Sequence, residues 1–232
     1  MENFIRLENL IGKEKLLKLN TKKVLIFGIG GVGGYVCEGL ARCGIGEFTL
    51  VDYDKVEASN INRQIIASTM TIGKQKAEVM KDRIIAINPK AKVSVLNICI
   101  NEENINLFDF SLYDYVIDAI DMVKSKIAII EKAKSQNVNI ISCMGTANKL
   151  DFTKLKIEDI SKTTMCPLAK VIRKILRDKK ITNVPVLYST EQPINSYDAK
   201  CPLSSIIFVP AVAGLYIASY VVYKLGEISG RI

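Results

Sequence analysis

The strongest constraint on the fold is a glycine-rich turn between an apolar strand pattern and a helical pattern. The segment FGIGGVGGYVCEGLARCG occupies residues 27–44, and four glycines fall within residues 28–33. Gly28, Gly30 and Gly33 form the pattern G-x-G-x-x-G, which lets the backbone approach phosphate groups at the N-terminus of the following helix. The turn therefore predicts an α/β fold that binds a nucleotide.

The rest of the chain continues this alternation of strand and helix patterns. We expect strands at 22–28, 47–54, 91–100, 113–121 and 138–145, and helices at 31–44, 74–88 and 124–137. Strands that read as continuous apolar runs between helices are typical of a parallel sheet covered on both faces. After residue 149 we expect an antiparallel strand within 149–161 and a helix at 167–180. The prediction is an α/β fold with a doubly wound, mostly parallel Rossmann-like sheet and an antiparallel extension in the second half.

The length and the C-terminal apolar run bear on domain organisation. We interpret residues 1–232 as a single domain, with an N-terminal helical arm at 1–20 and a substrate-side extension and closing helix at 149–232. The run at 202–226 is about as long as a membrane span. Because Pro210 and Gly214 interrupt it, we expect a soluble protein with this helix buried in the domain and no stable membrane insertion.

The amino-acid composition limits the catalytic groups and metal sites that the chain can form. The chain has no histidine, which removes the commonest general base and metal ligand. The six cysteines form no C-x-x-C pair, so neither a zinc ribbon nor a secreted disulfide framework is expected. The start of the chain carries charges throughout, unlike a signal peptide. We therefore expect a reducing, cytoplasmic setting, and the net charge of +8 favours a polyanionic partner.

The residues after the second expected strand favour ATP over a dinucleotide. Asp52 lies 19 residues after Gly33, where an acid that binds a ribose belongs. Asn60, Arg63 and Lys76 follow at the same edge of the sheet. A dinucleotide needs little positive charge, whereas a triphosphate needs cations to neutralise it and to stabilise a leaving pyrophosphate. An NAD-dependent oxidoreductase stays open as an alternative, although it would lack a histidine for proton transfer.

Four segments carry a resemblance to a known family. GIGGVG, DYDKVEASNINRQ, IGKQKAEVMKDRIIAINP and VIDAID resemble the ubiquitin-activating-enzyme superfamily, whose bacterial members adenylate a carboxylate with ATP and magnesium. The resemblance implies an ATP site that contains Gly28, Gly30, Gly31, Gly33, Asp52, Asp54, Ser59, Asn60, Arg63, Lys76 and Asp121. It implies that Asp121 holds Mg²⁺, and that catalysis uses Arg63, Lys76, Asn60 and Arg6.

The resemblance also implies a homodimer, because this family sends the arginine that matches Arg6 into the partner's ATP site. One departure is Met122, where the family usually has asparagine after the magnesium-binding acid.

The second half resembles one branch of this superfamily. KIEDISKTTMCPLAKVIRKILRD and LYSTEQPI are similar to the tRNA threonylcarbamoyladenosine dehydratases, which usually have D-P-L where this chain has Cys166-Pro167-Leu168. The branch implies ATP-dependent cyclisation of threonylcarbamoyladenosine next to the tRNA anticodon, through adenylation of its carboxylate. On the expected helix at 167–180, an apolar stripe of Leu168, Val171, Ile172, Ile175 and Leu176 faces inward. The opposite side carries Lys170, Arg173, Lys174 and Arg177, either for tRNA phosphates or as an ordinary solvated face.

Other interpretations stay open at this point. The chain could instead activate the C-terminus of a small sulfur-carrier protein, although such enzymes usually carry two C-x-x-C pairs. It could also be a non-catalytic nucleotide-binding partner in a sulfur relay, or act with a sulfur-transfer protein. Cys166 and Cys201 are expected to be structural or incidental rather than catalytic, because a catalytic thiol needs a base or a positive neighbourhood.

Overall fold

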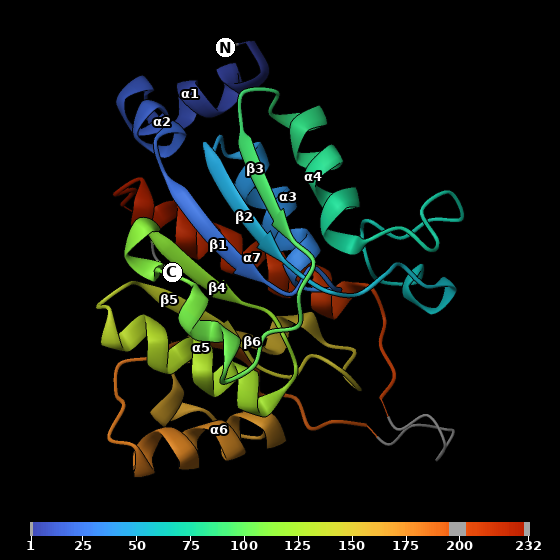
Figure 1. The fold of residues 1–232 in the computed structure, drawn as a ribbon, viewed down its shortest axis with the longest axis vertical. Coiled ribbons are helices and arrows are strands. Elements are labelled where there is room, and N and C mark those ends of the chain that lie inside the picture. Colours follow the sequence, from blue (N-terminus) through green and yellow to red (C-terminus); the bar gives the residue numbers. More distant parts are fainter. Residues whose placement is uncertain (1, 195–202, 230–232) are drawn as a thin grey trace.

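The computed structural model describes residues 2–194 and 203–229 and forms a seven-stranded sheet with the order β3-β2-β1-β4-β5-β7-β6 (Figure 1). All neighbouring strands are parallel except β6 and β7, which pair antiparallel. The strands are β1 (Lys23–Phe27), β2 (Glu47–Val51), β3 (Lys92–Leu96), β4 (Tyr115–Asp118), β5 (Ile140–Cys143), β6 (Leu155–Asp159) and β7 (Pro185–Ser189). The predicted fold class is confirmed, including the antiparallel extension.

The helices connect and cover these strands. They are α1 (Ile5–Ile11), α2 (Lys13–Asn20), α3 (Gly33–Arg42), α4 (Lys76–Ile87), α5 (Val123–Ser135), α6 (Pro167–Asp178) and α7 (Phe208–Leu225). The order reverses between β1 and β4: the chain runs outward to β2 and β3, then returns to β4 on the other side. The carboxyl ends of β1 and β4 therefore form the switch point where a doubly wound sheet binds its ligand.

The sheet separates two hydrophobic cores. Along β1, Val24 and Ile26 contribute to the core under α3, α4 and α7, whereas Leu25 and Phe27 contribute to the core under α5 and α6. Successive side chains of a strand point to opposite faces, so an uninterrupted apolar strand must be covered on both sides. This is the physical basis of the apolar runs in the sequence.

Helix α7 packs closely on α3. A Cβ atom at Gly214 would lie 2.4 Å from the carbonyl oxygen of Val32, and one at Gly39 would lie 2.7 Å from the Cβ atom of Ala218. Two glycines thus let the helices approach. By length and composition α7 alone among the described helices resembles a membrane span, but half of that window is buried inside the domain. We interpret α7 as a core helix that keeps Phe208, Leu215 and Tyr223 exposed, so it is buried on one side only.

The buried face of α6 and the residue that caps this helix can be compared with the sequence expectations. Val171, expected in the apolar stripe, is 46% exposed because the core contacts of α6 are made by Ala169, Ile172 and Leu176 instead. Cys166 is buried and caps α6, and its Sγ atom accepts a hydrogen bond from the backbone N–H of Ala169 at 3.5 Å. Cys201 lies outside the described residues.

Candidate functional site

The glycine turn leaves backbone N–H groups free at the start of α3. Gly28 has φ +85°, and a Cβ atom at Gly33 would lie only 1.7 Å from the carbonyl oxygen of Gly28. Within the described part of the chain, the N–H groups of residues 30–33 donate no hydrogen bond, whereas Gly34 already bonds Gly30 in the helical manner. Free N–H groups at a helix N-terminus form an anion site. The turn can therefore hold phosphate groups.

Asp52 lies directly beside this turn, as expected. One carboxylate oxygen accepts the N–H of Ile29 at 2.6 Å, and the other accepts the N–H of Asp54 at 2.8 Å. Burial raises the pKa of Asp52, and these two backbone N–H groups and Lys76 act in the opposite direction. An ionised carboxylate offers about four acceptor positions. Lone pairs therefore remain for the hydroxyls of a ribose.

Lys76 reaches the same edge of the sheet from the first turn of α4. Its Nζ atom forms an ion pair with Asp54 at 2.7 Å, and the lysine side chain is only 8% exposed. The backbone strengthens this arrangement, because the N–H of Lys76 donates to the carbonyl of Asp54 at 3.0 Å. The two residues lie close to Asp52, whose pKa both affect. The structure thus brings Asp52, Asp54 and Lys76 together at the carboxyl end of β2.

The segment after the short helix η2 (Ala58–Asn60) lines the glycine turn. Arg63 donates to the carbonyl of Ser59 at 2.8 Å and to Asn62 Oδ1 at 3.0 Å. A Cβ atom at Gly31 would lie 3.7 Å from Arg63 Cγ, so the arginine stem lies along the turn. Asn60 is buried, and its Oδ1 atom accepts the N–H of Glu57 at 3.1 Å. In this structure Asn60 shapes the loop, and the aliphatic part of Arg63 lies beside Gly31 while its Nη1 atom bonds the same loop.

Asp121 follows β4 and is exposed to solvent. The pKa of Tyr53 is raised by its acidic neighbours, first Asp54, then Cys99, and also Asp121 and Asp52. Because β4, β1 and β2 are parallel, Asp121 follows the carboxyl end of β4 at the same edge of the sheet as Asp52 and Asp54, which follow β2. No group of three or more cysteine or acidic side chains in the described residues could hold a metal by itself. A single exposed carboxylate can bind Mg²⁺ where phosphate oxygens of the substrate supply further ligands.

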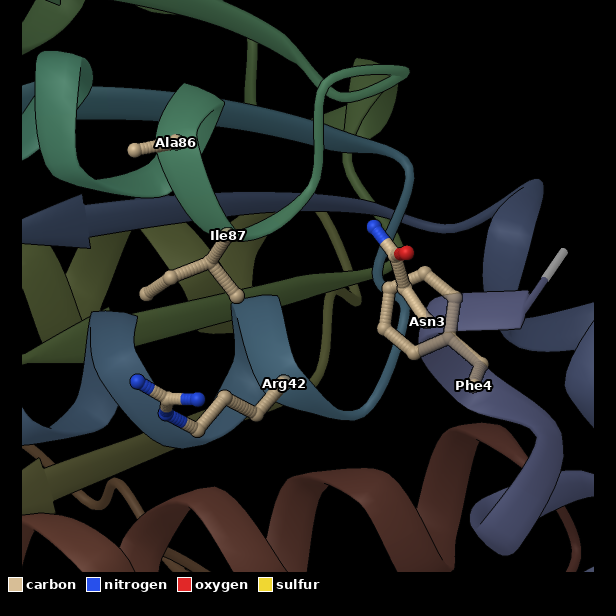
Figure 2. Close-up of a pocket in the computed structure, with 5 residues that line it drawn as sticks. All are labelled: Asn3, Phe4, Arg42, Ala86 and Ile87. Atoms are coloured by element: carbon tan, nitrogen blue, oxygen red, sulfur yellow. The ribbon is translucent and has the colours of Figure 1, made fainter.

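Arg6 does not join this site within its own chain. It lies exposed on α1, at the opposite, amino-terminal edge of the sheet. The neighbouring segments show this position: Phe4 and Asn20 approach Gly44, which precedes β2. A hollow of about 380 Å³ at this edge is lined by Asn3, Phe4, Arg42, Ala86 and Ile87 (Figure 2). Its arginine already binds a glutamate at 2.7 Å, and the hollow is separate from the glycine turn.

The basic residues of α6 divide into two groups. Arg173 is half-buried, and its Nη1 atom donates to the carbonyl and to the hydroxyl of Thr163 at 2.5 and 2.6 Å. Arg173 is thus less exposed than the other basic residues of α6, because Thr163 in the loop before α6 binds its Nη1 atom. Lys170, Lys174 and Arg177 are exposed, and we call these three residues the basic face of α6.

Sequence reasoning missed two polar features near the glycine turn. Gln64 is 7% exposed, and its Oε1 atom has no hydrogen-bond partner among the described residues. The only sequence signal was its place in SNINRQ, directly after Arg63. The second feature is a fully buried ion pair between Asp118 and Lys126, with 2.8 Å between Nζ and Oδ2. Asp118 also accepts the hydroxyl of Ser142 at 2.5 Å.

Comparisons with known proteins identify the family and the fold. A family model described as the ThiF family matches residues 4–230. The tRNA threonylcarbamoyladenosine dehydratase of Bacillus subtilis (strain 168) is 42% identical, over 97% of this chain and 95% of the relative. The crystal structure of the Escherichia coli tRNA N6-threonylcarbamoyladenosine dehydratase, TcdA, in complex with ATP matches with a TM-score of 0.90 and 33% identity, over 97% of this chain and 94% of that one. The adenylyltransferase and sulfurtransferase UBA4 of Saccharomyces cerevisiae is 30% identical, over 65% of this chain and 34% of the relative.

Proposed function

The chain belongs to the ThiF family, and from this premise we propose that it dehydrates threonylcarbamoyladenosine in tRNA, with ATP as the second substrate. The resemblance drawn from the sequence motifs is thereby confirmed at the level of the family. One observation supports the specific activity: similarity to the Bacillus subtilis dehydratase extends over 97% of the chain, including the second half, whereas similarity to the adenylyltransferase and sulfurtransferase UBA4 covers 65%. The second half is where the two activities must differ, because both need the same ATP site.

The first proposed step makes a mixed anhydride. An oxygen of the substrate carboxylate attacks the α-phosphorus of ATP, the bond to the β-phosphate breaks, and pyrophosphate leaves. This step needs stabilisation of charge rather than a strong base. Arg63 beside Gly31 and Lys76 beside Asp52 are the cations in position to supply it.

The ion pair with Asp54 positions Lys76 for this step. The pair holds the ammonium group at the edge of the phosphate site before the nucleotide arrives. A triphosphate carries more negative charge than one carboxylate and competes with Asp54 for the lysine. Asn60 supports the step indirectly in this structure, because its side chain fixes the turn that leads to Arg63.

The second proposed step closes a ring. The ureido group of the substrate attacks the activated carbonyl carbon and loses a proton to solvent, the bond between that carbon and the bridging oxygen breaks, and AMP leaves with this oxygen. Both reacting groups belong to one molecule, so proximity supplies a large part of the rate. A chain without histidine can perform both steps. The net change in the nucleoside is the loss of one water.

Mg²⁺ fits this scheme as a phosphate-bound ion held by Asp121. Mg²⁺ is usually bound by one or two carboxylates together with substrate phosphates and water. The exposed carboxylate of Asp121, at the same edge of the sheet as Asp52 and Asp54, matches that requirement. Bound there, the ion would neutralise phosphate charge as pyrophosphate leaves.

We also propose that the active form is a homodimer. Arg6 lies at the amino-terminal edge of the sheet, away from the glycine turn of its own chain. An arginine in that place can reach an ATP site only on a second copy, as the family resemblance implies. The protein would act in the cytoplasm, and a sulfur-transfer protein is a further possible partner.

The basic face of α6 is the proposed contact for tRNA phosphates. Its three side chains are exposed, and the chain as a whole carries a net charge of +8. Phosphate contacts release counterions, so binding should weaken steeply as salt is raised. Arg173 is the least exposed of the four basic residues expected to meet tRNA, and its Nη1 atom is bonded to Thr163.

Mass spectrometry of hydrolysed tRNA tests the proposed activity. tRNA that carries threonylcarbamoyladenosine is incubated with the protein, with and without ATP and Mg²⁺, and nucleosides are recovered under mild conditions. The expected product is lighter by one water and appears only with ATP. An unchanged nucleoside, together with adenylation of a small carrier protein at its C-terminus, would favour the alternative activity.

A further inference from the structure

Three exposed apolar side chains lie around the loops that follow β5 and β7. They belong to Leu150, Phe152 and Met165, and we call these three residues the apolar rim. Single exposed apolar residues are normal on a protein surface, whereas apolar side chains gathered in one place can mark an interaction site. These side chains share the segment after β7: the N–H of Leu150 donates to Glu191 Oε1 at 3.0 Å, and Met165 Sδ lies 4.0 Å from Gln192 Nε2.

The turn that carries Phe152 is fixed by side-chain hydrogen bonds. The Glu191 carboxylate accepts the backbone N–H groups of Leu150 and Asp151, each at 3.0 Å. Asp151 in turn accepts the N–H of Thr153 at 2.8 Å. An ordered turn loses little conformational freedom when a ligand binds to it. The structure thus presents Phe152, which is 45% exposed, to solvent from a preorganised position.

The apolar rim lies beside the nucleotide site. Asn148, in the loop after β5, donates its N–H to the carbonyl of Ser204 at 2.8 Å. The next carbonyl, that of Ser205, accepts a hydrogen bond from Asn62 Nδ2 at 3.0 Å. Asn62 belongs to the loop that lines the glycine turn. The short helix η5 (Phe152–Lys154) also lies beside α7, whose first turn contacts the glycine turn. Direct contacts therefore connect the apolar rim to the proposed ATP site.

The topology places the apolar rim on the side from which the substrate arrives. Asp52, the proposed partner of the ribose of ATP, follows β2 on one side of the glycine turn. Strands β4, β5 and β7 end on the other side. With ATP in place, the substrate carboxylate reaches the α-phosphate from this second side. The adenine that carries the threonylcarbamoyl group then lies over the loop after β5.

The charges around the apolar rim favour RNA as its partner. Lys154 belongs to η5, Lys170 lies one helical turn after Met165, and both lysines are exposed. Proteins bind single-stranded RNA loops by stacking unpaired bases on aromatic rings, while cations contact the backbone phosphates. A second copy of this chain would bring the same lysines and the same net charge of +8 to the surface. Charge complementarity therefore favours a polyanion over a second copy.

We propose that Phe152 stacks on the adenine base of the threonylcarbamoyladenosine, with Leu150 and Met165 at the edges of this contact. Lys154 and Lys170 contact the adjoining phosphates. Stacking holds the unpaired base outside the site while its threonylcarbamoyl group extends to ATP. This assignment rests on the proposed function, from which it takes the substrate.

The test combines substitutions in the protein with removal of the base from the RNA. Phe152→Ala removes the ring, and Phe152→Tyr keeps it. Leu112→Ala is the control, because Leu112 is also exposed but precedes β4 at the opposite edge of the sheet. Fluorescence anisotropy measures the affinity for an anticodon stem-loop that carries threonylcarbamoyladenosine, and for the same RNA with an abasic site at that position. Calorimetry with ATP and thermal unfolding check the nucleotide site and the fold.

Stacking predicts a loss of affinity that depends on the base. Phe152→Ala should weaken binding of the modified RNA about tenfold, whereas Phe152→Tyr and Leu112→Ala should bind it as the wild type does. On the abasic RNA, the wild type and Phe152→Ala should have equal affinity, because no base remains to stack. ATP affinity and unfolding temperature should not change.

Unchanged affinity of Phe152→Ala for the modified RNA would overturn the assignment. If the same substitution also dissociates a dimer in sedimentation, the apolar rim is an interface between copies of the chain. Equal weakening on the abasic RNA would show that the ring contacts another part of the RNA, and this also overturns it. Failure of the proposed function gives a different result: the wild type leaves the modified tRNA unchanged with ATP, whatever the affinities are.

Discussion

Replacing Lys126 by methionine should destabilise the protein by about 3–4 kcal/mol at pH 7. Lys126 and Asp118 are both fully buried and form an ion pair at 2.8 Å. Removal of one partner from a buried pair leaves an uncompensated charge, which typically costs about 3–5 kcal/mol. The Asp118 carboxylate would keep its bonds from Ser142 and from the N–H of Ile120, but no cation would remain beside it.

Protonation limits this cost and makes it depend on pH. A lone buried carboxylate escapes part of the penalty by taking up a proton, which costs an ordinary aspartic acid about 4 kcal/mol at pH 7. That cost falls by about 1.4 kcal/mol for each pH unit below 7. The destabilisation caused by Lys126→Met should therefore shrink as the pH falls from 7 towards 5. Urea unfolding at both pH values, at one protein concentration, measures the difference.

A double variant and a control complete this test. Asp118→Asn with Lys126→Met removes both charges and keeps the overall shape, so it should recover most of the lost stability. Lys22→Met breaks the pair with Asp114, in which both side chains are partly exposed, and should cost about 1 kcal/mol or less. A cost below about 1 kcal/mol for Lys126→Met at pH 7, or no recovery in the double variant, would refute the reasoning.

The other predictions concern the site and its partners. Lys76→Ala should abolish ATP turnover with little loss of stability, because its pair with the half-exposed Asp54 is replaced by solvent contacts; release of AMP and thermal unfolding check the two parts. Mixing inactive Arg6→Ala with inactive Lys76→Ala should restore part of the activity, since a mixed dimer has one intact site; a fully active monomer would contradict this. Neutralising the basic face of α6 should raise the KM for tRNA and flatten its salt dependence, with ATP affinity unchanged. Burial opposes ionisation of Glu38, but hydrogen bonds from Arg83 and Arg42 lower its pKa overall. Glu38→Gln should therefore reduce the free energy of unfolding above about pH 4, and this loss should vanish as the pH falls through the lowered pKa.

The fold was predictable because its signals are local and periodic. Apolar strands such as β1 read as continuous runs since both faces of the sheet are covered. The glycine turn and Asp52 were also predictable, because a tight strand-to-helix turn and the end of the next strand fix their places relative to each other. The regular alternation of strand and helix patterns ends after residue 149, and this change indicated the antiparallel strand that β6 forms with β7.

The interactions that depend on tertiary neighbours could not be read from periodicity. A helical pattern places Arg173 with the exposed basic residues, but the position of Thr163 in the preceding loop decides its real environment. The two buried charges of Asp118 and Lys126 looked like ordinary polar residues at the ends of a strand and a helix. Gln64 lay within a motif of the site, yet only coordinates reveal that its amide oxygen is buried and unpaired.

The central claim is that this chain activates the substrate carboxylate by adenylation, and an oxygen label tests it most directly. Both carboxylate oxygens of the threonylcarbamoyl group are replaced by heavy oxygen, the labelled tRNA is incubated with protein, ATP and Mg²⁺, and the released AMP is analysed by mass spectrometry. Because the carboxylate oxygen that attacks phosphorus leaves with AMP when the ring closes, each AMP should carry one heavy oxygen. Unlabelled AMP formed together with the dehydrated nucleoside, or label found in pyrophosphate or water, would contradict the account.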